Sequence, residues 1–114
     1  MVGTEQDKYE LASQEDRSAL RARLSIPAGL RPSGGKSIQT VVRDLSMSGF
    51  SATAVSRIHN GTRCWLTMPG MESLAAKVVW WDNGLVGCAF ENLLNPIILD
   101  DIVARWSDPG IYKG

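Results

Sequence analysis

Two short motifs of this sequence combine side chains that can bind a nucleotide. In the first, Arg17 and Arg21 lie four positions apart. The second has the pattern D-x-S-x-x-G and consists of Asp44, Ser46 and Gly49. A guanidinium can donate two hydrogen bonds to a phosphate or to the O6/N7 edge of guanine, and it can stack on a base. A carboxylate can accept from guanine N1–H and N2–H, a hydroxyl can add a hydrogen bond, and a glycine permits a tight turn or close ligand approach. The two motifs together predict a bound nucleotide.

Four further residues can supplement this site. Arg23 and Arg43 extend the group of arginines in the first half of the chain, although both could equally be outward residues of strands. Ser48 offers a second hydroxyl inside the D-x-S-x-x-G motif. Trp80 can stack on a base, but simple packing is the stronger interpretation. Because Trp80 and Trp81 are adjacent, we expect one of them to be buried and the other exposed on a strand.

The motif residues also allow an interpretation without a ligand. The two arginines could be solvated side chains at helical spacing, paired with Glu15 or Asp16. The segment from Asp44 to Ser46 could be an Asx turn that ends a strand. On this interpretation each motif would be a local structural device only.

No catalytic or metal site is predicted. Cys64 and Cys88 lack the spacing of metal ligands and are expected to be small core residues, and His59 is the only histidine. Asp44, Ser46 and His59 include the residue types of a catalytic triad, but nothing like a nucleophile elbow surrounds the serine. We therefore expect a protein that is not an enzyme and needs no cofactor or metal.

Composition bounds the possible partners. With 114 residues, 44% of them apolar, the chain can form one domain with a core. Twelve basic residues balance twelve acidic ones, which argues against binding to duplex nucleic acid, since that needs a broad basic face. Binding of a small anionic ligand needs only a local cluster of basic residues. The polar, acidic start of the chain and the absence of a long apolar run predict a cytoplasmic protein without membrane insertion.

The elements that must position the motifs are short strands. Leu24, Ile26, Ala28 and Leu30 alternate with polar residues, which is typical of a half-buried strand. Similar patterns, separated by turn residues such as Asn83-Gly84, predict strands over residues 21–31, 36–45, 50–55, 63–68, 73–81 and 85–91. Apolar residues at helical spacing predict a helix over 95–106. So few antiparallel strands hide their edges best by closing. We expect an all-β fold, a six-stranded antiparallel barrel with a C-terminal α-helix at one end. The expected domain covers residues 16–108, between a flexible arm (1–15) and a tail (109–114).

The order of motifs and elements resembles the PilZ family. Gly61 before a strand, the apolar stretch 78–80 and the segment Gly87-Cys-Ala-Phe90 before the helix agree with that family, and the resemblance covers residues 17–106. PilZ domains are receptors for the bacterial second messenger cyclic di-GMP. The resemblance implies that Arg17 and Arg21 fold over the ligand from the segment before the barrel. It also implies that Asp44, Ser46 and Gly49 contact guanine. The sequence departs from the family in having an acidic residue, Asp16, directly before the first arginine.

The resemblance implies a receptor and adaptor. On binding cyclic di-GMP, the arginine arm would change conformation and signal to an unidentified downstream protein. The main alternative is a PilZ-like protein-interaction adaptor that does not bind nucleotide. A third interpretation, a small barrel for single-stranded nucleic acid, needs stacking aromatics beside a basic groove, and only 7% of the residues are aromatic.

Overall fold

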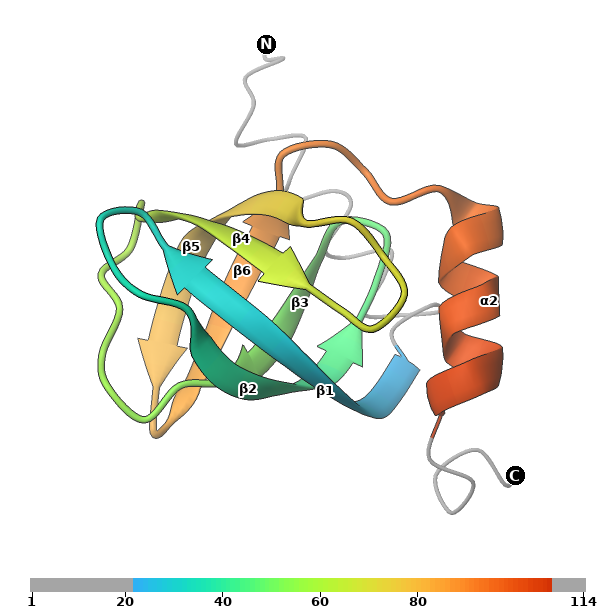
Figure 1. Ribbon diagram of the computed structural model, residues 1–114, viewed down its shortest axis with the longest axis horizontal. Coiled ribbons are helices and arrows are strands. Elements are labelled where there is room, and N and C mark those ends of the chain that lie inside the picture. Colours follow the sequence, from blue (N-terminus) through green and yellow to red (C-terminus); the bar gives the residue numbers. More distant parts are fainter. Residues whose placement is uncertain (1–21, 108–114) are drawn as a thin grey trace, which may run out of the picture.

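The described residues form a closed β-barrel with a helix beside it (Figure 1). The computed structural model describes residues 22–107. Its strands are β1 (Ala22–Pro32), β2 (Ile38–Leu45), β3 (Gly49–Thr53), β4 (Arg63–Thr67), β5 (Leu74–Asp82) and β6 (Leu85–Phe90), followed by helix α2 (Pro96–Trp106). All neighbouring strands are antiparallel, and the barrel order is β1-β2-β3-β6-β5-β4. The predicted fold class is therefore confirmed. The arm and tail expected at residues 1–15 and 109–114 lie outside the described residues.

Local sequence explains the strands and their turns. The alternation predicted for the first strand is observed, since Leu24, Ile26 and Leu30 are buried on the inner face of β1. Asn83 and Gly84, which join β5 to β6, both have positive φ, at 49° and 81°. A two-residue hairpin of this twist needs positive φ at both positions, and asparagine and glycine adopt it at least cost.

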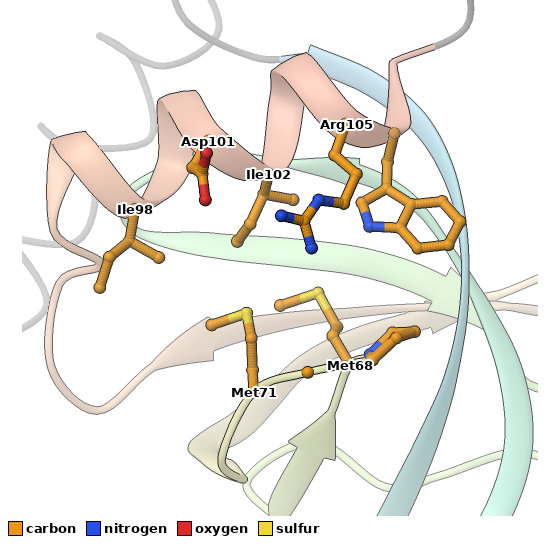
Figure 2. A pocket seen from close by; sticks show the side chains of 9 residues that line it. Met68, Met71, Ile98, Asp101, Ile102 and Arg105 are labelled. Atoms are coloured by element: carbon orange, nitrogen blue, oxygen red, sulfur yellow. The ribbon is translucent and has the colours of Figure 1, made fainter.

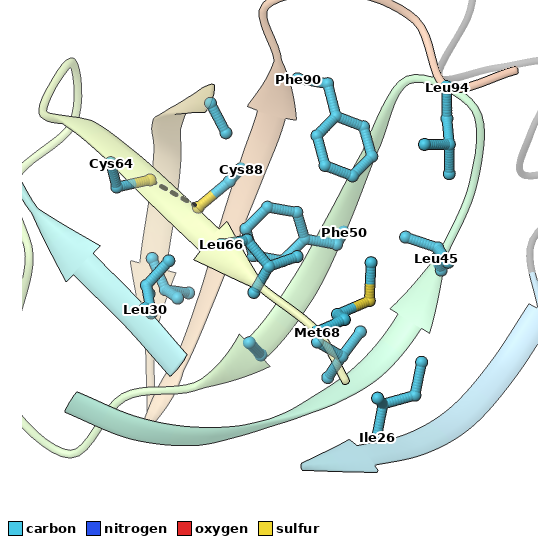
Figure 3. Close-up of a cluster of buried hydrophobic side chains, with 14 of the residues drawn as sticks. Ile26, Leu30, Leu45, Phe50, Cys64, Leu66, Met68, Cys88, Phe90 and Leu94 are labelled. Carbon is cyan, nitrogen blue, oxygen red and sulfur yellow. Dashed lines mark hydrogen bonds between the residues drawn. The ribbon is translucent and has the colours of Figure 1, made fainter. Parts of the chain in front are cut away.

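The core fills the inside of the barrel (Figure 3). The rings of Phe50 and Phe90 pack with their centroids 5.4 Å apart and tilted by 39°. Cys64 and Cys88 are buried as predicted, and the Cys64 thiol donates to the Cys88 sulfur at 3.8 Å. The hydrogen bond with Cys64, together with burial, raises the pKa of the Cys88 thiol. Both cysteines are free and contribute to packing.

Helix α2 lies across one end of the barrel and contacts β1 (Figure 1). Asn95 caps its N-terminus, with Oδ1 accepting from the N–H of Ile97 at 2.7 Å, and Pro96 occupies the first turn. Leu99 and Ile102 form its buried face. Among residues 22–107, no helix has the length and apolar character needed to span a membrane.

Candidate functional site

A β-bulge in β2 turns the aspartate of the motif to the outside of the barrel. Thr40 and Val42 are buried, so strict alternation would also direct Asp44 inward. Instead the pairing with β3 shifts register between Val42 and Asp44, and Arg43 becomes the additional residue. As a result Arg43 is exposed, Asp44 is half-buried, and Leu45 returns to the core.

A second bulge does the same for Trp80 in β5. Here the pairing with β6 shifts register between Val78 and Trp80, which adds Val79 to the outer face. Val79 and Trp80 are 52% and 40% exposed. Trp81 instead packs against the core, and its Nε1 donates to the carbonyl of Ala54 at 2.8 Å. The adjacent tryptophans thus divide between outside and inside, as expected.

These two bulges, and a third register shift between Arg23 and Ile26 of β1, bring residues from five strands into one row across the outside of the barrel. Successive strand pairings align β1, β2, β3, β6 and β5 in the order Arg23, Asp44, Ser51, Gly87 and Trp80. The core residues Phe50 and Ala52 flank Ser51, so its side chain is directed outward. We call these five residues the outer row. It holds a cation, a carboxylate, a hydroxyl and an indole side by side.

Ser51 orients the carboxylate of this row. Its Oγ donates to Oδ2 of Asp44 at 2.6 Å, and the serine is only 3% exposed. A short hydrogen bond to a charged acceptor fixes the direction of the carboxylate. Ser51 is not among the residues predicted from the sequence. Its signal was the alternation of a serine with Phe50 and Ala52 on the strand that follows the motif.

The indole of Trp80 packs against Gly87, where a side chain would leave no room for it. A Cβ at position 87 would overlap Nε1 and Cε2 of that indole. The ring therefore lies directly against the backbone of β6, next to Ser51 in the strand register. The part of the Trp80 side chain that remains exposed faces solvent within the outer row.

We expect Gly87→Ala to destabilise the protein by about 1–3 kcal/mol, because the new methyl group must displace the indole. The three nearest atoms to that methyl group all belong to Trp80. In a Trp80→Ala background, the same substitution should therefore cost much less. A double-mutant cycle of unfolding free energies measures this coupling. Additive free energies in the cycle would show that Trp80 does not rest on Gly87.

The hydroxyls of the motif hold its turn together. The N–H of Ser46 donates to the carbonyl of Gly49 at 2.9 Å, and Oγ of Ser46 accepts from the N–H groups of Ser48 and Gly49, both at 3.3 Å. Ser46 and Ser48 are 7% and 6% exposed. The turn is held by Ser46, whereas the interpretation without a ligand expected an Asx turn from Asp44 to Ser46. Direct contact of Ser46 or Ser48 with a ligand stays a prediction.

Gly49 is required by the packing of β3 on β6. A Cβ at this position would overlap the backbone carbonyl oxygen of Cys88. The close approach considered from the sequence is therefore made by the protein's own backbone. The turn is also tied to the end of β6, because Phe90 N–H donates to Ser48 O at 2.9 Å. Leu94 N–H, in the segment before α2, donates to Met47 O at 2.8 Å.

The arginine pair is not placed by the structure. Arg17 and Arg21 lie outside the described residues, which begin at Ala22. Arg23 is described and exposed, and it lies opposite Asp44 in the β1–β2 register. The structure therefore brings Arg23, Asp44 and Trp80 into one row and leaves the two leading arginines as a prediction.

A separate groove of about 290 Å³ lies beneath α2 (Figure 2). Met68 and Met71 face Ile98 and Ile102 across it, and Arg105 extends from α2 to line it as well. None of the predicted site residues described by the structure lines this groove. Within residues 22–107 no group of three or more His, Cys, Asp or Glu side chains is placed to hold a metal ion.

The chain is similar to known proteins in sequence and in fold. A family model described as PilZ domain matches residues 15–104. Among solved structures, the fold is similar to the crystal structure of the PilZ domain of CeSA from a cellulose-synthesizing bacterium. The TM-score is 0.55 at 20% identity, over 76% of this chain and 93% of that chain. No curated protein matches the chain. At this identity the solved structure supports the shared fold alone.

Proposed function

Since the chain belongs to the PilZ domain family, whose members are generally cyclic di-GMP receptors, we propose that it binds cyclic di-GMP and relays the signal to a partner protein. The observation that carries the proposal is the outward carboxylate of Asp44, oriented by Ser51 at 2.6 Å. A carboxylate in this position can accept both N1–H and N2–H of a guanine. The exposed indole of Trp80, in the same row, offers a face on which a base can stack.

The arginine motif completes the proposed site from the segment before β1. Arg21 precedes Arg23 by two positions, so covalent geometry keeps their Cα atoms within about 7 Å of each other. Arg17 is six positions from Arg23, a reach of at most about 21 Å. Both guanidinium groups can therefore approach a ligand held over Asp44, which Arg23 faces in the strand register. They would neutralise its phosphates.

The proposed hydrogen bonds to cyclic di-GMP are numerous enough to support micromolar affinity. Hydrogen bonds to charged groups contribute about 1.5–3 kcal/mol each. Four of them contribute about 6–12 kcal/mol before the costs of association and of ordering the arginine segment, which is of the same order as the ~8 kcal/mol of micromolar binding.

We propose that the signal leaves through a change in the arginine arm. Cyclic di-GMP would order the segment around Arg17 and Arg21 across the outer row, creating a surface that the partner recognises. The functional domain would then comprise residues 16–108, flanked by the arm (1–15) and the tail (109–114). A cytoplasmic location belongs to the same proposal. No step requires catalysis or a metal ion.

Hydrogen exchange with and without cyclic di-GMP tests this proposal. We expect slower exchange in residues 12–23 and in the strands that carry the outer row, because the arginines and the row would close on the ligand. Residues 56–62, on the connection before β4, serve as an internal control that should not change. No change anywhere at about 100 µM ligand would favour the adaptor without nucleotide binding. Protection of the row without residues 12–23 would contradict only the arm.

A further inference from the structure

Apart from the outer row, a cluster of cations surrounds a tryptophan on the outside of the barrel. The guanidinium of Arg31 lies over the ring of Trp65, 4.3 Å from its centroid, and that of Arg63 lies 5.2 Å from it. The strand register pairs Arg31 of β1 with Trp65 of β4, and Arg63 of β4 with Lys77 of β5. We call Arg31, Arg63, Trp65 and Lys77 the arginine–tryptophan surface. It shares no residue with the outer row.

The charges of this surface are not balanced. Arg63 forms a two-point ion pair with Glu91, through Nε to Oε2 at 2.6 Å and Nη2 to Oε1 at 3.1 Å. Within residues 22–107, Glu91 is the one carboxylate that forms an ion pair with these three cations. The Arg63 side chain nevertheless stays 54% exposed. Two further cations, Arg31 and Lys77, are exposed beside it.

The arrangement places positive charges close together. Like charges directly opposite each other on paired strands, such as Arg63 and Lys77, are destabilising. The cation–π contacts and the two-point ion pair of Arg63 offset part of this repulsion, but they bring no anion to Arg31 or Lys77. An external anion would offset the repulsion, and the exposed guanidinium edges are available to it.

We infer that the arginine–tryptophan surface docks a carboxylate-rich segment of a partner protein. The pair between Arg63 and Glu91 already displays the bidentate geometry in which a guanidinium binds a carboxylate. Arg31 presents a second guanidinium on the neighbouring strand, and strands lie about 4.8 Å apart. An extended acidic segment can therefore place successive carboxylates along the surface.

The structure favours a protein segment over nucleic acid as the occupant. Arg31 and Arg63 both lie against the Trp65 ring, which leaves its faces poorly available for stacking a base. The net charge of +0 provides no broad basic face for a duplex. An acidic segment needs only the local excess of positive charge that these residues supply.

The surface borders the proposed nucleotide site. Lys77 pairs with Ala89, which pairs with Gly49 of the D-x-S-x-x-G motif. A segment docked here would lie two strands from that motif. Its identification with the downstream partner rests on the proposed function, whereas the docking of an acidic segment does not.

Titration of the full chain with a hexaglutamate peptide, followed by NMR without cyclic di-GMP at about 0.15 M salt, tests the inference. We expect saturable shifts of the Trp65 indole N–H and of the Arg31 and Arg63 side-chain N–H signals. Hexaglutamine should cause none. Lys77→Glu and Arg31→Glu should each weaken binding about three- to tenfold, because each replaces an attraction by a repulsion.

Arg57→Glu is the matched control, since Arg57 is exposed, lies outside the surface and changes the net charge equally. It should bind the peptide like the unmodified chain. Absence of saturable shifts up to about 10 mM peptide, or equal weakening by Arg57→Glu, would overturn the inference. Binding of oligothymidylate in place of the peptide would overturn it in favour of nucleic acid. Because no nucleotide is present, loss of cyclic di-GMP binding in a separate titration would leave this result unaffected.

Discussion

Replacing Asp44 by asparagine is expected to weaken cyclic di-GMP binding by at least about 100-fold in calorimetry, close to 3 kcal/mol. Asparagine keeps an oxygen that can accept from Ser51, so the 2.6 Å contact of the native carboxylate has a substitute. Its NH₂ group, however, would point a donor at the N1–H and N2–H donors of guanine. Binding should therefore fall while the unfolding temperature changes little. Asp44→Ala should show the same loss together with lower stability, because Ser51 is left without its acceptor.

The same titration with Arg21→Ala tests the arginine motif. This residue lies outside the described structure, and the proposal gives it two hydrogen bonds to the ligand, so a loss of comparable size is expected. Arg57→Ala removes an exposed arginine from the connection before β4, outside both motifs and the outer row, and should bind normally. Normal binding by both Asp44→Asn and Arg21→Ala would refute the site. No heat from the unmodified protein at about 100 µM ligand would favour the adaptor without nucleotide binding.

Gly49→Ala should cost about 3 kcal/mol of folding stability and lower the unfolding temperature by more than about 10 °C. The new Cβ would overlap the carbonyl oxygen of Cys88, which is backbone and cannot rotate away. The strands cannot easily separate either, because Phe90 N–H donates to Ser48 O directly beside the clash. Thermal unfolding followed by circular dichroism measures the effect.

Gly35→Ala provides the matched control. A Cβ at position 35 would meet its nearest neighbour, the carbonyl oxygen of Pro32, at an ordinary 3.6 Å. We expect its stability to stay within about 0.5 kcal/mol of that of the unmodified protein. If Gly49→Ala were equally well tolerated, the close approach of β3 and β6 would not be the reason for a glycine in the motif. Close contact with the ligand would then be the remaining explanation.

Most of the fold was predictable because local rules decided it. The alternation through Leu24, Ile26 and Leu30 identified β1, and the pair Asn83-Gly84 identified the β5–β6 hairpin. The helical spacing of apolar residues predicted a helix over 95–106, close to the observed bounds of α2. Each of these signals acts between residues that are close in sequence, so no partner strand has to be known.

Whether the side chains of the site face the inside or the outside of the barrel was not predictable from local pattern. Period-two alternation from Val42 and Val78 would have placed Asp44 and Trp80 inside the barrel. The register shifts in β2 and β5 reverse both. A bulge depends on how two distant strands pair, which an alternating pattern in one strand does not encode. For the same reason Ser51, whose partner Asp44 lies across the β2–β3 pair, was not recognised.

The number and order of the strands and the C-terminal helix follow from local patterns in the sequence, and the same local reading identifies the residues of both motifs. Tertiary structure alone decided which motif residues share a surface. Four strand pairings and their register shifts align Arg23, Asp44, Ser51 and Trp80. Backbone packing against Cys88 requires Gly49. The physical reason is that strand register is set by pairing and core packing between segments far apart in the chain.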